Sequence, residues 1–405
     1  MTSSARILCA TVLIAAGVAM FAPSPGASSE HFIITNNNYF DAQNSGTILK
    51  LGGTRANPTL TATQTLATAV ISDGNEATPS VQIVSKGSQA CVFLGDTEIA
   101  GNAISAFKFP GLQLVGSYSD FNVPSSASGL AVVTHGDFLY AAFSGYNNSN
   151  FVDSWTINPD CSLSLLHTIS LLNALDSLAV TPDGNTLVGG YTNEGGIVDS
   201  FSIGSSGSLA ELGPFGEQVA IGANGMDITG DGKYAIFMLS AYGGEGDQNT
   251  QIEVFSINPN GTLGSQQVWG GDGELGPGWG AGASVRLSPD GTFLYADSEE
   301  SHGGIQVTTL DLSENPFELT YNGCITTLKL PQGEPPTVPG DMATVVPSGA
   351  GGGLYVSEYS NFGTIGLLSV DSKSGCTTEV AGSPYIVTTN GGLLNSLVAW
   401  PPRPF

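Results

Sequence analysis

Acidic side chains recur in glycine-rich stretches between residues 241 and 304. Carboxylates among backbone carbonyls could ligate a hard cation such as calcium, and paired acids beside a histidine could catalyse hydrolysis. The metal candidates are Glu245, Asp247, Asp272 and Glu274, and the binding candidates beside them are Trp279, Glu299 and His302. No DxDxDG calcium loop is present. Three interpretations stay open: solvated acidic loops, a calcium site and a catalytic site.

Two opposite charges stand at equivalent places, three residues before a recurring turn. Asp227 lies in GMDITGDGKYAIFML and Arg286 in SVRLSPDGTFLYADS, whereas the same place elsewhere carries Ile83, Val132, Ala179, Thr344 and Val398. A lone buried charge is costly, but a hydrogen-bonded pair is tolerated. The pair could fix packing, or Arg286 could hold a carboxylate or lactone oxygen of a ligand. We name both residues as binding candidates.

The composition excludes several function classes. The chain has 405 residues, 41% of them hydrophobic and 11% charged, with a net charge of −25. It has a core to bury, and it is too poor in charge for a coiled coil. Ten Lys and Arg residues cannot neutralise a phosphate backbone, so we expect no nucleic-acid partner. No cofactor is implied apart from calcium, and we expect a monomer.

The first 29 residues are typical of a secretory signal. Arg6 precedes an apolar run over residues 7–22 that is short for a membrane span, and a Pro/Gly/Ser stretch follows it. A membrane anchor is the less favoured alternative. We therefore predict a protein that does not span the membrane. Its mature chain, residues 30–405, is expected to be secreted, periplasmic or at the cell surface.

Export permits disulfides, and four cysteines remain after the signal: Cys91, Cys161, Cys324 and Cys376. They allow three complete pairings. Four cysteines in so long a chain do not make a disulfide scaffold, and no CxxC pair indicates zinc. Free thiols are the favoured interpretation.

Internal repeats indicate the fold. Six segments share an apolar run, a tight turn and a second apolar run, as in SLAVTPDGNTLVGGY from Ser177. The turns recur every 47 to 59 residues, beginning at Lys86, His135, Pro182, Gly230, Pro289 and Pro347. A second hairpin, such as IEVFSINPNGTL from Ile252, follows several of them. Each repeat therefore reads as a four-stranded antiparallel sheet, and radial stacking of such sheets gives a propeller.

The chain ends complete the count. FIITNNN, GTILKL and LTATQTLA near the N-terminus supply three strands, and LLNSLVAW from Leu393 supplies the fourth. We predict an all-β propeller of seven blades, closed by pairing the C-terminal strand with the N-terminal strands. The longer connections all lie on one face of such a ring, which makes this face the place to look for function.

The quoted phrases, with AGSPY near the C-terminus, resemble secreted YVTN-type propellers and the seven-bladed lactonase family, which includes 6-phosphogluconolactonase-like enzymes. The resemblance implies the propeller fold and lactone hydrolysis. It also implies a proline-flanked histidine phrase, and no HPH occurs in this chain. We therefore favour a binding or interaction protein that presents a small-molecule, saccharide or protein site on one loop face. The alternative is a lactonase-type hydrolase acting on a sugar or carboxylic lactone.

Overall fold

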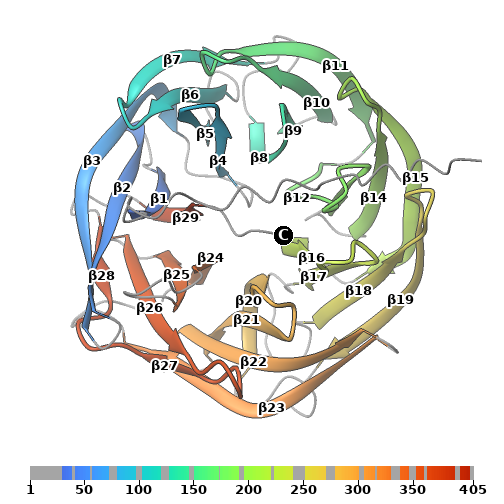
Figure 1. Cartoon of the computed structure of the whole chain (residues 1–405). Coiled ribbons are helices and arrows are strands. Elements are labelled where there is room, and N and C mark those ends of the chain that lie inside the picture. The colour runs from blue at the N-terminus through green and yellow to red at the C-terminus, as the bar shows by residue number, and fades with distance from the viewer. Residues whose placement is uncertain are drawn as a thin grey trace, which may run out of the picture. The chain divides into compact units, whose positions relative to one another are not determined.

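A computed structural model describes most of the chain from Glu30 onward. The described residues are 30–38, 42–54, 57–72, 80–96, 103–119, 127–145, 150–172, 174–190, 196–219, 223–239, 251–270, 279–300, 305–314, 317–329, 338–345, 353–359, 363–387 and 393–401. Within them the regular structure is entirely strand and turn, arranged as seven antiparallel sheets in a ring (Figure 1). The predicted seven-bladed propeller is confirmed.

Each sheet forms one blade, in which four strands follow one another from the inner edge of the ring outward. Blade 1 has β29 (Leu393–Trp400), β1 (His31–Asn38), β2 (Ala42–Thr54) and β3 (Asn57–Ser72). Blade 2 has β4 (Val81–Lys86), β5 (Gln89–Asp96), β6 (Ala103–Phe109) and β7 (Gln113–Tyr118). Blade 3 has β8 (Ala127–His135), β9 (Phe138–Gly145), β10 (Asn150–Ile157) and β11 (Leu163–Leu171). Blade 4 has β12 (Ser177–Val180), β13 (Thr186–Gly190), β14 (Gly196–Ile203) and β15 (Leu209–Val219).

The last three blades follow the same order. Blade 5 has β16 (Ala223–Ile228), β17 (Tyr234–Leu239), β18 (Gln251–Ile257) and β19 (Leu263–Gly270). Blade 6 has β20 (Trp279–Leu287), β21 (Phe293–Glu300), β22 (Ile305–Glu314) and β23 (Phe317–Leu328). Blade 7 has β24 (Val338–Val345), β25 (Gly353–Tyr359), β26 (Thr364–Val370) and β27 (Thr377–Glu379), and β28 (Tyr385–Ile386) also pairs with β26.

The two ends of the chain close the ring. Strand β29 pairs antiparallel with β1, so that Phe32 lies opposite Trp400 and Ile34 opposite Val398. Each innermost strand also contacts the innermost strand of the next blade around the whole circle. The predicted closure is therefore confirmed, because the described inner strands of all seven blades contact one another in an unbroken ring.

The recurring turns that the sequence shows are held by one local device. In blade 4, the Thr181 hydroxyl donates to the Asp183 carboxylate at 2.6 Å, and Gly184 adopts a φ of 73° that favours glycine. The turns at Asp231 and Asp290 repeat the device with Thr229 and Ser288. The hydroxyl hydrogen bond lowers the pKa of Asp183. Short polar residues thus join the first two strands without any contribution from the core.

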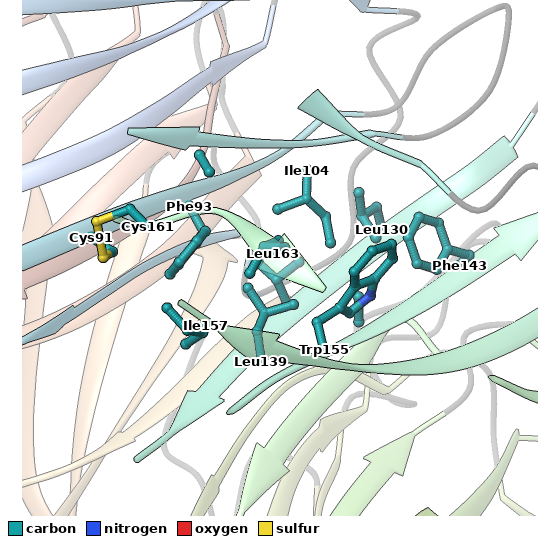
Figure 2. Close-up of a cluster of buried hydrophobic side chains, with 13 residues drawn as sticks. Cys91, Phe93, Ile104, Leu130, Leu139, Phe143, Trp155, Ile157, Cys161 and Leu163 are labelled. Atoms are coloured by element: carbon teal, nitrogen blue, oxygen red, sulfur yellow. A yellow bond between two sulfur atoms is a disulfide. The ribbon is translucent and has the colours of Figure 1, made fainter. Parts of the chain in front are cut away.

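Seven apolar clusters fill the seven interfaces between neighbouring blades. Figure 2 shows the cluster between blades 2 and 3, where Phe93 and Ile104 of blade 2 meet Leu139 and Trp155 of blade 3. Such side chains gain roughly 1.5–3 kcal/mol each from full burial. The blades are therefore layers of one continuous core, since a single sheet has no other way to cover both faces.

The cysteines form two disulfides, Cys91–Cys161 and Cys324–Cys376, and the expectation of free thiols is wrong. Each bond joins one blade to the next, blade 2 to blade 3 and blade 6 to blade 7, with Cα atoms 5.4 Å apart. The partners lie 70 and 52 residues apart in the sequence. Their proximity arises from the stacking of blades, which cysteine spacing alone does not reveal.

Candidate functional site

The inner edge of blades 5 and 6 carries the two predicted charges. Asp227 lies on β16 and Arg286 on β20, and both side chains are partly exposed. The other partly exposed side chains of the described inner strands are uncharged, apart from those at the turn ends of β4 and β8. They include Gln82, Val133, Thr134, Ala179, Val180 and Val398. Away from the turn ends, Asp227 and Arg286 are therefore the charged and partly exposed residues among the inner-strand side chains that the structure describes.

Asp227 joins blade 5 to blade 6. Its Oδ2 accepts a hydrogen bond of 2.9 Å from the Leu287 amide, and its Oδ1 accepts one of 2.9 Å from the Ile228 amide. Neighbouring Met226 and Ile228 belong to the cluster against blade 4, so alternation along the strand turns Asp227 toward blade 6. The two amide hydrogen bonds fix the position of the carboxylate between the blades.

Arg286 joins blade 6 to blade 7. Its Nε donates to the Met342 carbonyl on β24 at 2.8 Å. Because Leu287 follows Arg286 directly, the same segment of β20 receives Asp227 from one side and reaches blade 7 on the other. The structure thus brings the two predicted residues to adjacent strands. A direct ion pair between them stays a prediction.

A guanidinium at this place can recognise a planar anion. Arginine presents five donors in a rigid fork that matches a carboxylate, and it remains charged at all ordinary pH values. With Nε directed to Met342, the orientation of the guanidinium plane is fixed by blade 7. The neighbouring Asp227 carboxylate can accept hydrogen bonds from ligand hydroxyl groups. The two together suit a molecule that carries both an acid or lactone group and hydroxyl groups.

The predicted acidic cluster falls largely outside the described residues. Glu245, Asp247, Asp272, Glu274 and His302 all lie there. The backbone of Trp279 and Glu299 is described at the adjoining ends of β20 and β21, where Trp279 pairs with Glu300. The calcium site therefore stays a prediction. Within the described ranges, no group of three or more His, Cys, Asp or Glu residues is placed to hold a metal ion.

The structure also reveals buried polar groups that the sequence reasoning missed. Asp96, which is fully buried, accepts hydrogen bonds from the Asn44 side chain and from the Ser105 hydroxyl, the latter at 2.9 Å. Asn44 in turn donates to Asn36, which donates to the Gly95 carbonyl at 2.7 Å. This network joins blades 1 and 2. The run of three asparagines at the end of a strand was the available signal, since asparagine is unusual inside strands.

Buried carboxyl groups recur on the third strands. Asp153 on β10, Asp199 on β14 and Glu253 on β18 are 0%, 1% and 1% exposed. Burial raises the pKa of Glu253 to about 7, although a hydrogen bond from the Gln266 side chain at 2.7 Å opposes the shift. At this depth the three groups are out of reach of a substrate, and they bear on the packing of the blades instead.

Fold and inner edge together define a seven-bladed β-propeller with a charged pair beside the ring axis, and comparison with known structures agrees. A periplasmic gluconolactonase of Pseudomonas aeruginosa has a TM-score of 0.65 at 16% identity, over 92% of this chain and 99% of that chain. A candidate 6-phosphogluconolactonase of Bacteroides fragilis has a TM-score of 0.62 at 16% identity, over 92% and 98%. A protein from Lactobacillus plantarum has a TM-score of 0.64 at 15% identity, over 91% and 99%. At these identities the likeness establishes the propeller fold alone, which is the fold that the sequence resemblance implied.

Comparison of the amino-acid sequence with known families and proteins gives one partial match. No family model matches the chain. Pre-mRNA-processing factor 19 of Schizosaccharomyces pombe is 30% identical over 152 residues, which cover 36% of this chain and 29% of that protein. The chain thus matches less than a third of the length of that relative. None of the described segments forms a helix with the length and hydropathy of a membrane span.

Proposed function

We propose that this propeller binds a small hydroxylated acid or its lactone at the inner edge of blades 5 and 6. Arg286 is the residue that would hold the carboxylate or the lactone oxygen, and Asp227 would accept hydrogen bonds from the hydroxyl groups. The observation that carries the proposal is the placement of both charges on adjacent inner strands, where both are partly exposed, Asp227 is held by the Leu287 amide and Arg286 by the Met342 carbonyl. Phosphorylated ligands fit less well, because so few basic residues are available to balance their charge.

Hydrolysis of the bound lactone is the second candidate. Two solved propellers of the same fold carry the names gluconolactonase and candidate 6-phosphogluconolactonase, which favours a lactone over other ligands. We also propose that the protein acts outside the cytoplasm. The N-terminal apolar run and the two disulfides between blades support an oxidising compartment.

Titration calorimetry with D-gluconate, and an assay of acid release from δ-gluconolactone with and without calcium, would test the proposal on the mature chain. We expect binding that weakens at least tenfold in Arg286→Ala, since a charge-assisted bidentate contact is lost. Asp227→Asn keeps an acceptor for the Leu287 amide and separates ligand binding from blade packing. Lys373→Ala, on an exposed turn, is the matched control for lost positive charge.

The outcomes distinguish the two functions. Binding without acid release supports the binding function, and acid release that disappears in Arg286→Ala supports hydrolysis. Equal affinity in Arg286→Ala and the parent protein, with both folded, would place the ligand elsewhere. The proposal would then be wrong.

A further inference from the structure

Three buried carboxyl groups occupy one position in successive blades. Asp153, Asp199 and Glu253 each stand four residues before the isoleucine that ends the third strand of blades 3, 4 and 5. Alternation along the strands places each group in a different interface. Asp153 shares a face with Trp155 between blades 2 and 3, and Glu253 shares a face with Phe255 between blades 4 and 5. Asp199 shares its face with residues packed between blades 3 and 4.

The buried charges of the described residues are all acidic. No Lys, Arg or His residue is buried among the described residues. Six carboxyl groups are buried, with at most 7% of each residue exposed: Asp96, Asp153, Asp176, Asp199, Glu253 and Asp297. Asp96 and Asp297 each accept two hydrogen bonds from neighbouring residues. In general, burial disfavours the charged form of a carboxyl group.

Glu253 has the surroundings that most strongly favour the protonated form. It accepts a hydrogen bond from a neutral amide, that of Gln266. Phe237 lies opposite it on β17, and the cluster on this face continues into blade 4 through Val188 and Val198. These neighbours offer neither charge nor further donors, so burial dominates and raises its pKa to about 7.

The other titratable groups of blades 4 and 5 do not supply a balancing cation. Asp199 alternates onto the face toward blade 3, Tyr234 packs toward blade 6, and Glu211 is exposed. Asp227 faces blade 6, and Lys233 is exposed on a turn.

We propose that the interface between blades 4 and 5 adapts the propeller to an acidic medium, because a proton on Glu253 holds the two blades together and its loss above neutrality weakens them. A glutamic acid in an unfolded chain titrates near pH 4.3. Between that pH and about 7 the folded protein binds one proton more than the unfolded chain. The contribution of Glu253 to stability is therefore greatest below this window and falls as the pH rises through it.

Unfolding of the mature protein by denaturant at pH 5, 6, 7 and 8 tests the proposal. We expect the unfolding equilibrium constant to rise roughly a hundredfold between pH 5 and pH 8, since the pKa difference exceeds two units. Glu253→Gln keeps a partner for Gln266 and removes the titrating group, so it should abolish most of this rise. Glu211→Gln is the matched control, because that acid is exposed on the neighbouring blade, and it should behave as the parent does.

Hydrogen exchange of the parent protein gives a second test that requires no variant to fold. Amides of β14 and β18 should lose protection between pH 5 and pH 8, after correction for the intrinsic exchange rate. Amides of β23 and β26, beside the Cys324–Cys376 disulfide, provide the internal reference. An unchanged pH dependence in Glu253→Gln, or equal loss of protection at both sites, would overturn the proposal.

Discussion

The interface between blades 6 and 7 and the interface between blades 4 and 5 are held by different means. Between blades 6 and 7, the Cys324–Cys376 disulfide stands beside a hydrogen bond of 2.7 Å between the Thr377 and Thr326 hydroxyls. The Lys329 amide also donates to Glu379 across this interface. Both interfaces contain an apolar cluster, and between blades 4 and 5 the described contacts are this cluster with Glu253 within it.

The difference separates two ways of joining sheets in a ring. The polar and covalent links lie on the outer strands, where water competes with each hydrogen bond. A disulfide there stabilises the interface by a covalent bond that does not depend on apolar burial. The apolar cluster depends on close contact and tolerates no charge, so its one acid becomes sensitive to pH. Blades 6 and 7 should therefore stay together under conditions that loosen blades 4 and 5.

Removal of residues 394–405 should have the largest effect on both interfaces. The deletion takes away β29, the inner strand of blade 1, and exposes the edges of blades 1 and 7. We expect loss of the cooperative thermal transition, because every blade relies on neighbours for burial. Hydrogen exchange should show blades 4 and 5 opening further than blades 6 and 7. An unchanged melting temperature would mean that the ring does not depend on this strand.

Phe255→Ala should specifically weaken the interface between blades 4 and 5. The side chain is fully buried and packs at 5.7 Å from the Phe237 ring centroid. Truncation leaves a cavity, and we expect a loss of about 4 kcal/mol in the free energy of unfolding. Leu165→Ala on an exposed outer strand is the control, with a change of less than about 0.5 kcal/mol. Equal effects would show that this cluster does not hold the blades.

Replacing Cys324 and Cys376 together by serine should weaken the other interface. The disulfide closes a segment of 52 residues, so we expect a loss of about 3 kcal/mol, measured as a lower denaturant midpoint under non-reducing conditions. Exchange should rise at β23 and β26, with β14 and β18 unaffected. A global rise would contradict the separation of the two interfaces.

Glu379→Gln should have the smallest effect. Burial raises the pKa of Glu379, while hydrogen bonds from Ser383 and Lys329 oppose the rise. A raised carboxyl pKa means that its stabilising proton is lost as the pH increases. Because the hydrogen bonds and Lys329 Nζ, 3.8 Å away, offset most of the effect of burial, we expect this group to change the melting temperature by about 1 °C or less between pH 5 and 8. A larger pH dependence than that of Glu253 would reverse the comparison.

Sequence reasoning predicted the fold because its signals are local. The turn at Asp183 needs a hydroxyl, a carboxylate and a glycine within four residues, and all three can be read directly. Counting such turns led to seven blades, and the strand from Leu393 was the natural partner for the strands near Phe32. Counting back from the turns also identified Asp227 and Arg286 as residues of adjacent inner strands.

The features that the sequence did not predict, which are the disulfides and the buried carboxyl groups, depend on contacts between blades. Cys91 and Cys161 are 70 residues apart, and nothing in their spacing distinguishes them from free thiols. Asp153, Asp199 and Glu253 look like surface acids, because a third strand with one acidic residue is equally consistent with a solvated face. Their burial follows from the neighbouring sheet, which the strand's own pattern does not describe.

The pairing of β1 with β29 also sets an order of assembly. Three strands of blade 1 are made first, yet their inner neighbour consists of residues 393–400. Blade 1 therefore waits for nearly the whole polypeptide, while blades 2 to 7 are each built from consecutive residues and can fold as they emerge. A chain whose synthesis stops early would form an incomplete ring of blades, in which the first and last blades expose unpaired strands and uncovered apolar faces. Only the full-length chain can close the ring.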